Sequence, residues 1–129
     1  VQDGARPLVT PVLIDRVVEA AARCGAAAPA IPMKDTIKTV TAEGAVTGTP
    51  DRSTLRAVQT PQVFEADLLK AALQSALENE IPVTDDCSAV ERLGKVVYLI
   101  DGNEENLKIT TPMDLVIAEA ILAEREARR

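Results

Sequence analysis

Apolar side chains recur every three or four residues in several stretches of the chain, the spacing of one face of an amphipathic helix. The first stretch begins at Thr10-Pro11, which suits an N-cap followed by the first helical position, and it ends at Gly25. The last begins at Thr111-Pro112, where Asp114 can complete a capping box. Four helices are therefore predicted, over residues 11–24, 66–78, 86–93 and from 112 onward.

Short β-prone runs alternate with these helices. Residues 27–33 form an apolar run, and Pro29 and Pro32 within it favour an edge position, because proline cannot donate to a strand ladder. Further strands are predicted over residues 96–100 and 107–110. Strands that alternate with helices indicate an α/β domain with a largely parallel sheet, which binds ligands beyond the carboxyl ends of its strands.

A β-hairpin is predicted between residues 36–40 and 45–49, with its turn at Glu43-Gly44. Threonine and lysine dominate it, so it has few apolar side chains to bury and would be marginally stable alone. We therefore expect a projecting arm, about residues 36–52, that contacts a partner. A loop without fixed structure is the alternative.

The size and composition of the chain are those of one globular domain, with 129 residues and a mass of 13.7 kDa. Phe64 and Tyr98 are the only aromatic residues, so alanine, valine, isoleucine and leucine must build the core. No apolar run approaches the roughly 20 residues that span a bilayer, and no signal peptide opens the chain. We expect a soluble, cytoplasmic protein without a membrane partner.

The net charge and the reactive side chains argue against several classes of function. Fourteen basic and twenty acidic residues give a net charge of −6, which argues against a nucleic-acid partner. Histidine is absent, which removes the commonest general base near neutral pH and the commonest metal ligand. Cys24 and Cys87 lie far apart, without the spacing of a zinc site. A few clustered cations could still hold a small anion.

Three polar stretches contain residues suited to phosphate chemistry. Asp3 can hold Mg²⁺ or a ligand hydroxyl, and Arg6 suits bidentate contact with a phosphate. Lys108 can neutralise charge that develops during phosphoryl or nucleotidyl transfer. Thr84 and its neighbours Asp85-Asp86 can offer a hydroxyl and amide groups to an anion. Each stretch also has a simpler interpretation: a surface ion pair, a solvated lysine, and a plain helix N-cap.

Six short motifs occur in one order along nearly the whole chain. They are Asp3-Gly4-Ala5-Arg6-Pro7, Asp35-Thr36-Ile37-Lys38, Pro50-Asp51-Arg52, Gln59-Thr60-Pro61-Gln62-Val63-Phe64, Thr84-Asp85-Asp86 with Ser88, and Glu105-Asn106-Leu107-Lys108-Ile109-Thr110-Thr111-Pro112. Together they closely resemble the C-terminal part of the 2-C-methyl-D-erythritol 4-phosphate cytidylyltransferases, enzymes of the non-mevalonate isoprenoid pathway.

The resemblance implies an enzyme that uses Mg²⁺ to transfer CMP from CTP to 2-C-methyl-D-erythritol 4-phosphate, releasing pyrophosphate. It implies a Rossmann-like nucleotidyltransferase sheet, partial here, and a homodimer in which Thr36 and Arg52 of each arm reach the other subunit's substrate site. Residues 1–129 would be the C-terminal portion of a single domain. The N-terminal portion, which holds the CTP triphosphate and recognises cytosine in the family, would be absent.

The resemblance also implies roles for individual residues near the reacting phosphates. Asp3 and Arg6 would orient the methylerythritol phosphate, and the hydroxyls of Thr60 and Thr84 would line the phosphate site. Lys108 would stabilise the negative charge that develops during attack on the α-phosphorus of CTP. This chemistry needs positioning and electrostatic stabilisation rather than a protein nucleophile, so the absence of histidine is no obstacle.

The chain departs from the family pattern at single positions and in its extent. Gln2 stands where the family often has histidine, and Arg56 stands where it has an aromatic residue. The missing N-terminal portion predicts a fragment of a longer protein or one piece of a nicked one. Two other functions stay open, a cytidylyltransferase for another polyol phosphate such as ribitol 5-phosphate, and a non-catalytic dimerisation module.

Overall fold

Four α-helices occupy the predicted stretches in the computed structural model, which describes residues 1–129. They are α1 (Pro11–Cys24), α2 (Ala66–Glu78), α3 (Asp86–Arg92) and α4 (Pro112–Ala127). The Thr10 hydroxyl accepts the Leu13 amide at 3.2 Å, and Thr111 and Asp114 form the predicted capping box. The sequence signals at these two helix starts are confirmed.

A four-stranded mixed sheet lies at the centre of the molecule. Its strands are β1 (Ala26–Pro32), β4 (Arg56–Val58), β5 (Val63–Phe64) and β6 (Tyr98–Asp101). β1 pairs in parallel with β6 on one side, and antiparallel with β5 and then β4 along the other. The α/β class is confirmed, whereas the prediction of a largely parallel sheet is wrong, because β4 and β5 run antiparallel to β1.

β1 is the central strand, so the edge position predicted from its prolines is wrong. It pairs with β5 through Ala26-Ala27 and with β4 from Ala30 onward, and Pro29 lies where one partner gives way to the next. No strand therefore lies opposite the missing Pro29 amide, and the Pro29 carbonyl accepts the Gln59 amide at 2.8 Å. The small, buried alanines of β1 suit a strand that is covered on both faces.

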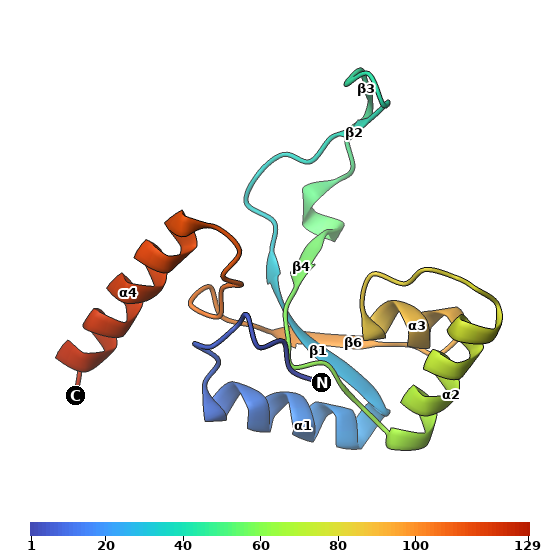
Figure 1. Ribbon diagram of the computed structural model, residues 1–129, viewed down its shortest axis with the longest axis horizontal. Coiled ribbons are helices and arrows are strands. Elements are labelled where there is room, and N and C mark those ends of the chain that lie inside the picture. Colours follow the sequence, from blue (N-terminus) through green and yellow to red (C-terminus); the bar gives the residue numbers. More distant parts are fainter.

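Aliphatic side chains build the core, as the composition predicts. Helix α1 packs on β1, where Val17 and Ala27 belong to one buried cluster. Helices α2 and α3 pack against each other (Figure 1), and Ala72 and Val90 join Ala26 in a second cluster. None of the helices combines the length and apolar character needed to cross a membrane.

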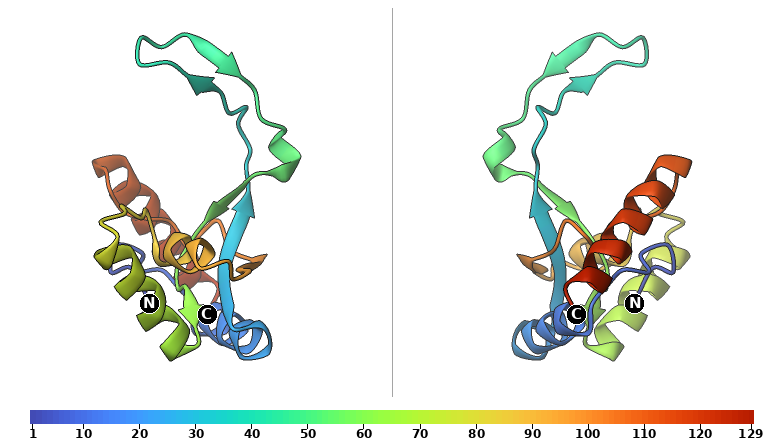
Figure 2. Two further views of the ribbon diagram at one scale, coloured as in Figure 1. Left: turned by 90° about the vertical axis from the view of Figure 1, so that its right-hand side faces the viewer. Right: turned by 90° about the vertical axis from the view of Figure 1, so that its left-hand side faces the viewer.

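The predicted hairpin forms and projects as an arm from the body of the molecule (Figures 1 and 2). Its strands β2 (Thr39–Val40) and β3 (Val46–Gly48) pair antiparallel and are shorter than predicted. Gly44 has a φ of 90°, a conformation that suits glycine in the turn. Residues 39–47 are all exposed. The arm's role in dimerisation stays a prediction.

The strand predicted over residues 107–110 is absent. This segment lies against an irregular loop rather than a strand, and a single backbone hydrogen bond joins them, from the Ile109 amide to the Ala5 carbonyl at 2.8 Å. Lys108 therefore lies in a loop, and that loop adjoins the one that contains Asp3.

Helix α4 stands apart from the sheet (Figure 1). Of its apolar residues, Ala118 is buried, whereas Leu115 is 53% exposed. Arg125 fastens the helix to the rest of the chain by donating to the Leu8 carbonyl and to Glu105, both at 3.0 Å. The helix forms as predicted, but this chain leaves most of its apolar face uncovered.

Candidate functional site

The loop of residues 3–6 is held in a tight turn by its own hydrogen bonds. Asp3 Oδ1 accepts the Ala5 amide at 2.8 Å, and the Asp3 carbonyl accepts the Arg6 amide at 3.0 Å. The hydrogen bond from Ala5 lowers the pKa of Asp3, and the nearby charges of Lys108 and Arg6 lower it further. The Asp3 side chain is therefore an ionised carboxylate at neutral pH.

Thr60 brings a second segment of the chain to this loop. Its hydroxyl accepts the Asp3 amide at 3.2 Å and donates to Gln2 Oε1 at 3.0 Å. Asp3 and Thr60 are 57 positions apart in sequence, so the fold, and not local spacing, makes them neighbours.

Lys108 comes from a third segment and faces the same loop. Its Nζ lies 3.5 Å from Asp3 Oδ2, and its side chain is 52% exposed. An exposed ion pair of this kind adds little to stability, so the ammonium can exchange the carboxylate for a bound anion at small cost. The role of Lys108 beside a phosphate stays a prediction.

Arg6 adds a second cation. Its Nη1 donates to the Asn106 carbonyl at 2.6 Å. Burial lowers the pKa of Arg6 and the charge of Asp3 opposes that change; the guanidinium stays protonated, because arginine does not lose its proton in proteins. We refer to Asp3, Arg6, Thr60 and Lys108 as the loop cluster.

A polar pocket of about 160 Å³ opens beside the loop cluster. Asp3 and Thr60 line it together with Asp85 and Asp86 from the start of α3. Gln62 also lines the pocket and donates to Asp85 Oδ2 at 3.0 Å. The pocket thus joins the loop cluster to the start of α3.

Thr84 directly precedes Asp85 in the sequence, but unlike Asp85 it does not line this pocket. Its exposed hydroxyl lies 3.1 Å from Ser88 Oγ, and Asp85 caps α3 by accepting the Ser88 amide at 2.8 Å. Burial acts to raise the pKa of Asp85, but hydrogen bonds from Ser88 and Gln62 outweigh it and lower the pKa. Asp85, not Thr84, is therefore the cap, and the role of Thr84 at a phosphate site stays a prediction.

Thr36 and Arg52 lie on the arm, where neither forms a hydrogen bond or ion pair with the loop cluster. Arg52 Nη1 donates to the Lys34 carbonyl at 2.6 Å. Arg52 and Arg56 line a separate pocket of about 440 Å³ at the arm's base. One chain therefore brings the loop cluster together and leaves Thr36 and Arg52 elsewhere; their action on a second subunit stays a prediction.

Three buried amide side chains behind the loop cluster were not among the predicted site residues. Asn106, Gln59 and Gln62 are 2%, 4% and 5% exposed. Asparagine and glutamine usually lie on protein surfaces, so hydropathy gives no sign of their burial. Their occurrence inside the shared motifs is the only sequence signal that could have indicated a role.

The carboxylates present fit a magnesium ion that is shared with substrate. No group of three or more acidic, histidine or cysteine side chains is arranged to hold a metal ion by itself. Mg²⁺ commonly takes one or two protein carboxylates and fills its shell with water and substrate phosphates. Asp3 lines the polar pocket and is ionised, so it suits that arrangement. The Mg²⁺ requirement stays a prediction.

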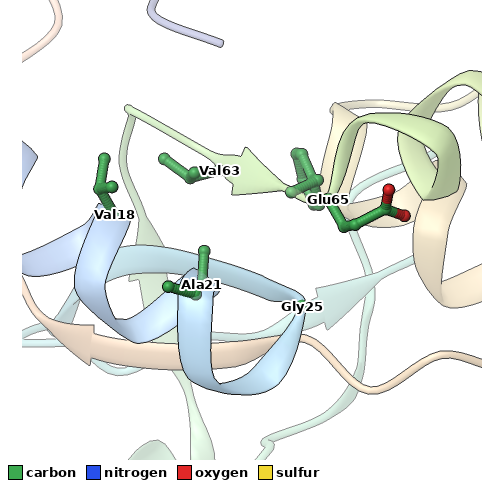
Figure 3. A pocket seen from close by; sticks show the side chains of 7 residues that line it. Val18, Ala21, Gly25, Val63 and Glu65 are labelled. Carbon is green, nitrogen blue, oxygen red and sulfur yellow. The ribbon is translucent and has the colours of Figure 1, made fainter.

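Two further features provide no candidate chemistry. Burial raises the pKa of the Cys87 thiol to about 12, so this cysteine is not a nucleophile at neutral pH. An apolar pocket of about 310 Å³ lies between α1 and β5 (Figure 3), where Val18, Ala21 and Val63 line it. No predicted site residue lines this pocket.

Comparison with known proteins assigns the family. The family model of the 2-C-methyl-D-erythritol 4-phosphate cytidylyltransferases matches residues 1–124. The chain belongs to this family. The cytidylyltransferase of Desulforamulus reducens is 51% identical over 125 residues, which are 97% of this chain and 53% of that protein. The cytidylyltransferase of Nocardia farcinica is 52% identical over 128 residues, which are 98% of this chain and 54% of that protein.

Solved structures of cytidylyltransferases share the fold. The crystal structure of the Thermus thermophilus cytidylyltransferase matches with a TM-score of 0.83 and 42% identity, covering 93% of this chain and 59% of that one. The 4-diphosphocytidyl-2C-methyl-D-erythritol synthase of Anaerococcus prevotii matches with a TM-score of 0.86 and 33% identity, covering 95% and 57%. The nucleotidyltransferase fold is confirmed, and this chain spans about half the length of the curated cytidylyltransferases it matches.

Proposed function

We propose that this chain is the C-terminal, polyol-phosphate-binding part of an enzyme that transfers CMP from CTP to 2-C-methyl-D-erythritol 4-phosphate. The main support is the loop cluster, where two cations, a carboxylate and a hydroxyl come together from three segments. The carboxylate and the hydroxyl line the polar pocket, and the two cations lie outside its lining. Charged donors bind phosphate strongly, while the carboxylate and hydroxyl suit the hydroxyls of a sugar alcohol. Identity of about one half to curated relatives supports this particular substrate.

The proposed reaction exchanges one phosphoanhydride bond of CTP for another. An oxygen of the methylerythritol phosphate attacks the α-phosphorus and forms a new phosphorus–oxygen bond. The bond from the α-phosphorus to the oxygen that bridges it to the β-phosphate breaks, and pyrophosphate leaves with that electron pair. Negative charge builds on the α-phosphate oxygens, so fixed cations accelerate the step.

Each member of the loop cluster has a place in this scheme. Lys108 exchanges its contact with Asp3 for the phosphates and stabilises charge in the transition state. Arg6 holds the methylerythritol phosphate, and Thr60 supplies a hydroxyl at the phosphate site. Asp3 would hold Mg²⁺ jointly with the CTP phosphates, and the ion would neutralise charge there when bound.

A second subunit and the remaining half of the enzyme complete the proposed site. In a homodimer joined by the arms, Thr36 and Arg52 of one subunit act on the other subunit's substrate, and Thr84 adds a hydroxyl near the pocket. CTP binds chiefly to the part of the protein that this chain does not include. Because CTP is a cytoplasmic nucleotide, we place the reaction in the cytoplasm.

Turnover by a completed enzyme tests the proposal. The completed enzyme joins this chain to the N-terminal part of the Desulforamulus reducens cytidylyltransferase. That relative was chosen because it is 51% identical to this chain over the 125 residues that the two share. Pyrophosphate release is measured with CTP, Mg²⁺ and either methylerythritol phosphate or ribitol 5-phosphate. We expect turnover of methylerythritol phosphate and little of ribitol 5-phosphate. The reverse preference would assign the other substrate, and no turnover of either would favour a dimerisation module.

A further inference from the structure

One buried residue, Asn106, contacts the other two segments that form the loop cluster, one through its side chain and one through its main chain. Its Nδ2 donates to the Thr60 carbonyl at 2.9 Å and to Gln59 Oε1 at 3.3 Å, and its main-chain carbonyl accepts Arg6 Nη1 at 2.6 Å. We propose that Asn106 is a positioning residue, which sets where Arg6, Thr60 and Lys108 stand around a bound phosphate. The inference rests on the proposed function for the identity of that phosphate.

Lys108 is fixed on both sides along the backbone. Two residues before it, the Asn106 carbonyl is bonded to Arg6. One residue after it, the Ile109 amide donates to the Ala5 carbonyl at 2.8 Å. These anchors, rather than the exposed ion pair with Asp3, hold the lysine backbone against the loop of residues 3–6.

The Gln59 side chain is hydrogen-bonded both to Asn106 and to the backbone of Asn103 in the same loop. Its Nε2 donates to the Asn103 carbonyl at 2.9 Å, and its Oε1 accepts the Asn103 amide at 3.3 Å. A Cβ on Gly102 would lie 2.5 Å from Gln59 Oε1, so Gly102 packs against Gln59 too closely for a side chain at that position. Asn106 Nδ2 therefore faces two fixed oxygen acceptors, and a carboxylate in its place would be repelled by both.

The contacts of Asn106 with the loops come from its Nδ2 and its main-chain carbonyl, and not from its Oδ1. Asn106 Oδ1 is buried without a hydrogen-bond partner, and so is Arg6 Nε. A buried polar atom without a partner adds nothing to stability, so Oδ1 does not help to hold the loops in place. We therefore attribute the role of Asn106 to the positions in which its Nδ2 holds Thr60 and its main-chain carbonyl holds Arg6.

The first test follows the loops themselves and does not depend on catalysis. Asn106→Asp and Asn106→Ala are compared with Asn103→Asp, a change in the same loop at an exposed side chain that only accepts the Glu105 amide. Hydrogen exchange of the Ile109 amide is measured by NMR in the 129-residue chain, with global unfolding measured in parallel. We expect exchange about tenfold faster or more in both Asn106 variants, and a change of less than about twofold in Asn103→Asp.

The second test is kinetic and uses the completed enzyme. Misplaced Lys108 and Arg6 should lower kcat by about tenfold to a hundredfold, while KM for CTP changes by less than about twofold. A purely structural role would instead reduce the amount of folded enzyme at unchanged kcat. Asn103→Asp should leave both constants unchanged.

The outcomes separate this inference from the proposed function. Unchanged Ile109 exchange, or a normal kcat in folded Asn106 variants of an active enzyme, would overturn the positioning role. If Asn106→Asp does not fold, Asn106→Ala decides, and failure of both to fold would make Asn106 a stability residue and overturn the inference. If the unmodified completed enzyme shows no turnover, the proposed function fails, and the exchange measurement alone decides the role of Asn106.

Discussion

At the scale of single residues, the site depends on a few short contacts between polar groups from distant parts of the sequence. Lys108 and Asp3 face each other at 3.5 Å, and Thr60 and Arg6 are held in the same region by hydrogen bonds to Asp3 and Asn106. Lys108 is half-exposed and bonded to nothing in the core. Its removal should therefore affect chemistry without affecting the fold.

Lys108→Ala tests that expectation in the completed enzyme. We expect kcat to fall by about a hundredfold, because the role proposed for the lysine is to stabilise charge that exists only in the transition state. The free energy of unfolding should change by less than about 0.5 kcal/mol, as for other surface substitutions. Steady-state kinetics and chemical denaturation measure the two effects. Lys95→Ala, at another exposed lysine, is the control. A change in KM alone would show that Lys108 binds substrate but does not stabilise the transition state.

Site residues with charged side chains were predictable from the sequence. Asp3, Arg6 and Lys108 are charged groups in polar stretches beside expected strand ends or helix starts, and the structure brings them together. Asn106 was not predicted, because nothing in its local sequence shows that it is buried at 2% exposure. The local sequence allows either Thr84 or Asp85 to cap α3, and the carboxylate of Asp85 is the group that accepts the Ser88 amide.

At the scale of elements, helix starts were predictable because their signals are local. Thr10 and Thr111 cap the helices that follow them, as their sequences indicate. The central position of β1 was not predictable. Pro29 is tolerated there because β5 pairs with β1 before Pro29 and β4 pairs with β1 after it. Residues 107–110 look β-prone but lie against a loop, so no ladder forms.

Removing the cap of α3 should destabilise the chain in a pH-dependent way. Asp85→Ala should lower the free energy of unfolding by about 1 kcal/mol near pH 7. The folded pKa of Asp85 lies below its ordinary value of 3.8, so its carboxylate contributes stability above that value and loses it as pH falls through the lowered pKa. The difference between Asp85→Ala and the unmodified chain should thus shrink toward about pH 2.

Chemical denaturation at both pH values measures this effect, with Thr84→Ala as the control. The Thr84 hydroxyl bonds only to Ser88, on an exposed surface, so its loss should change stability little. An equal effect of the two substitutions, or an Asp85→Ala effect that grows in acid, would contradict the assignment of the cap.

The exposed arm should be dispensable for folding and necessary for assembly. Replacing residues 39–48 by a short glycine turn removes the whole paired part of the hairpin, which contributes nothing to the two buried clusters. We expect an unchanged melting temperature and a loss of dimerisation in analytical ultracentrifugation. Dimers that persist without the arm would show that subunits associate through another surface.

At the scale of the whole molecule, the described chain has features that a larger assembly would explain. The apolar face of α4 is largely uncovered, and the chain spans about half the length of the curated cytidylyltransferases. The loop cluster and Arg52 lie in different parts of one chain. A dimer in which the arm of one subunit reaches the loop cluster of the other would unite them.

Subunit mixing tests this arrangement. The Arg52→Ala and Lys108→Ala forms of the completed enzyme should each be nearly inactive, and mixing them should restore pyrophosphate release. In a mixed dimer, one site combines an intact Lys108 with an intact Arg52 from the other subunit. Activity that stays at the level of the separate variants, although mixed dimers form, would place Arg52 and Lys108 in the same subunit's site or Arg52 outside the site.

Binding of methylerythritol phosphate to the completed enzyme, followed residue by residue by NMR with the 129-residue portion labelled, tests whether the loop cluster is one substrate site. We expect the largest shifts at Asp3, Arg6, Thr60 and Lys108, and we expect them to saturate together at one affinity. The same side chains should stay unshifted when inorganic sulfate is added at equal concentration. Shifts confined to other surfaces, or different affinities at these residues, would contradict a single substrate site built from the loop cluster.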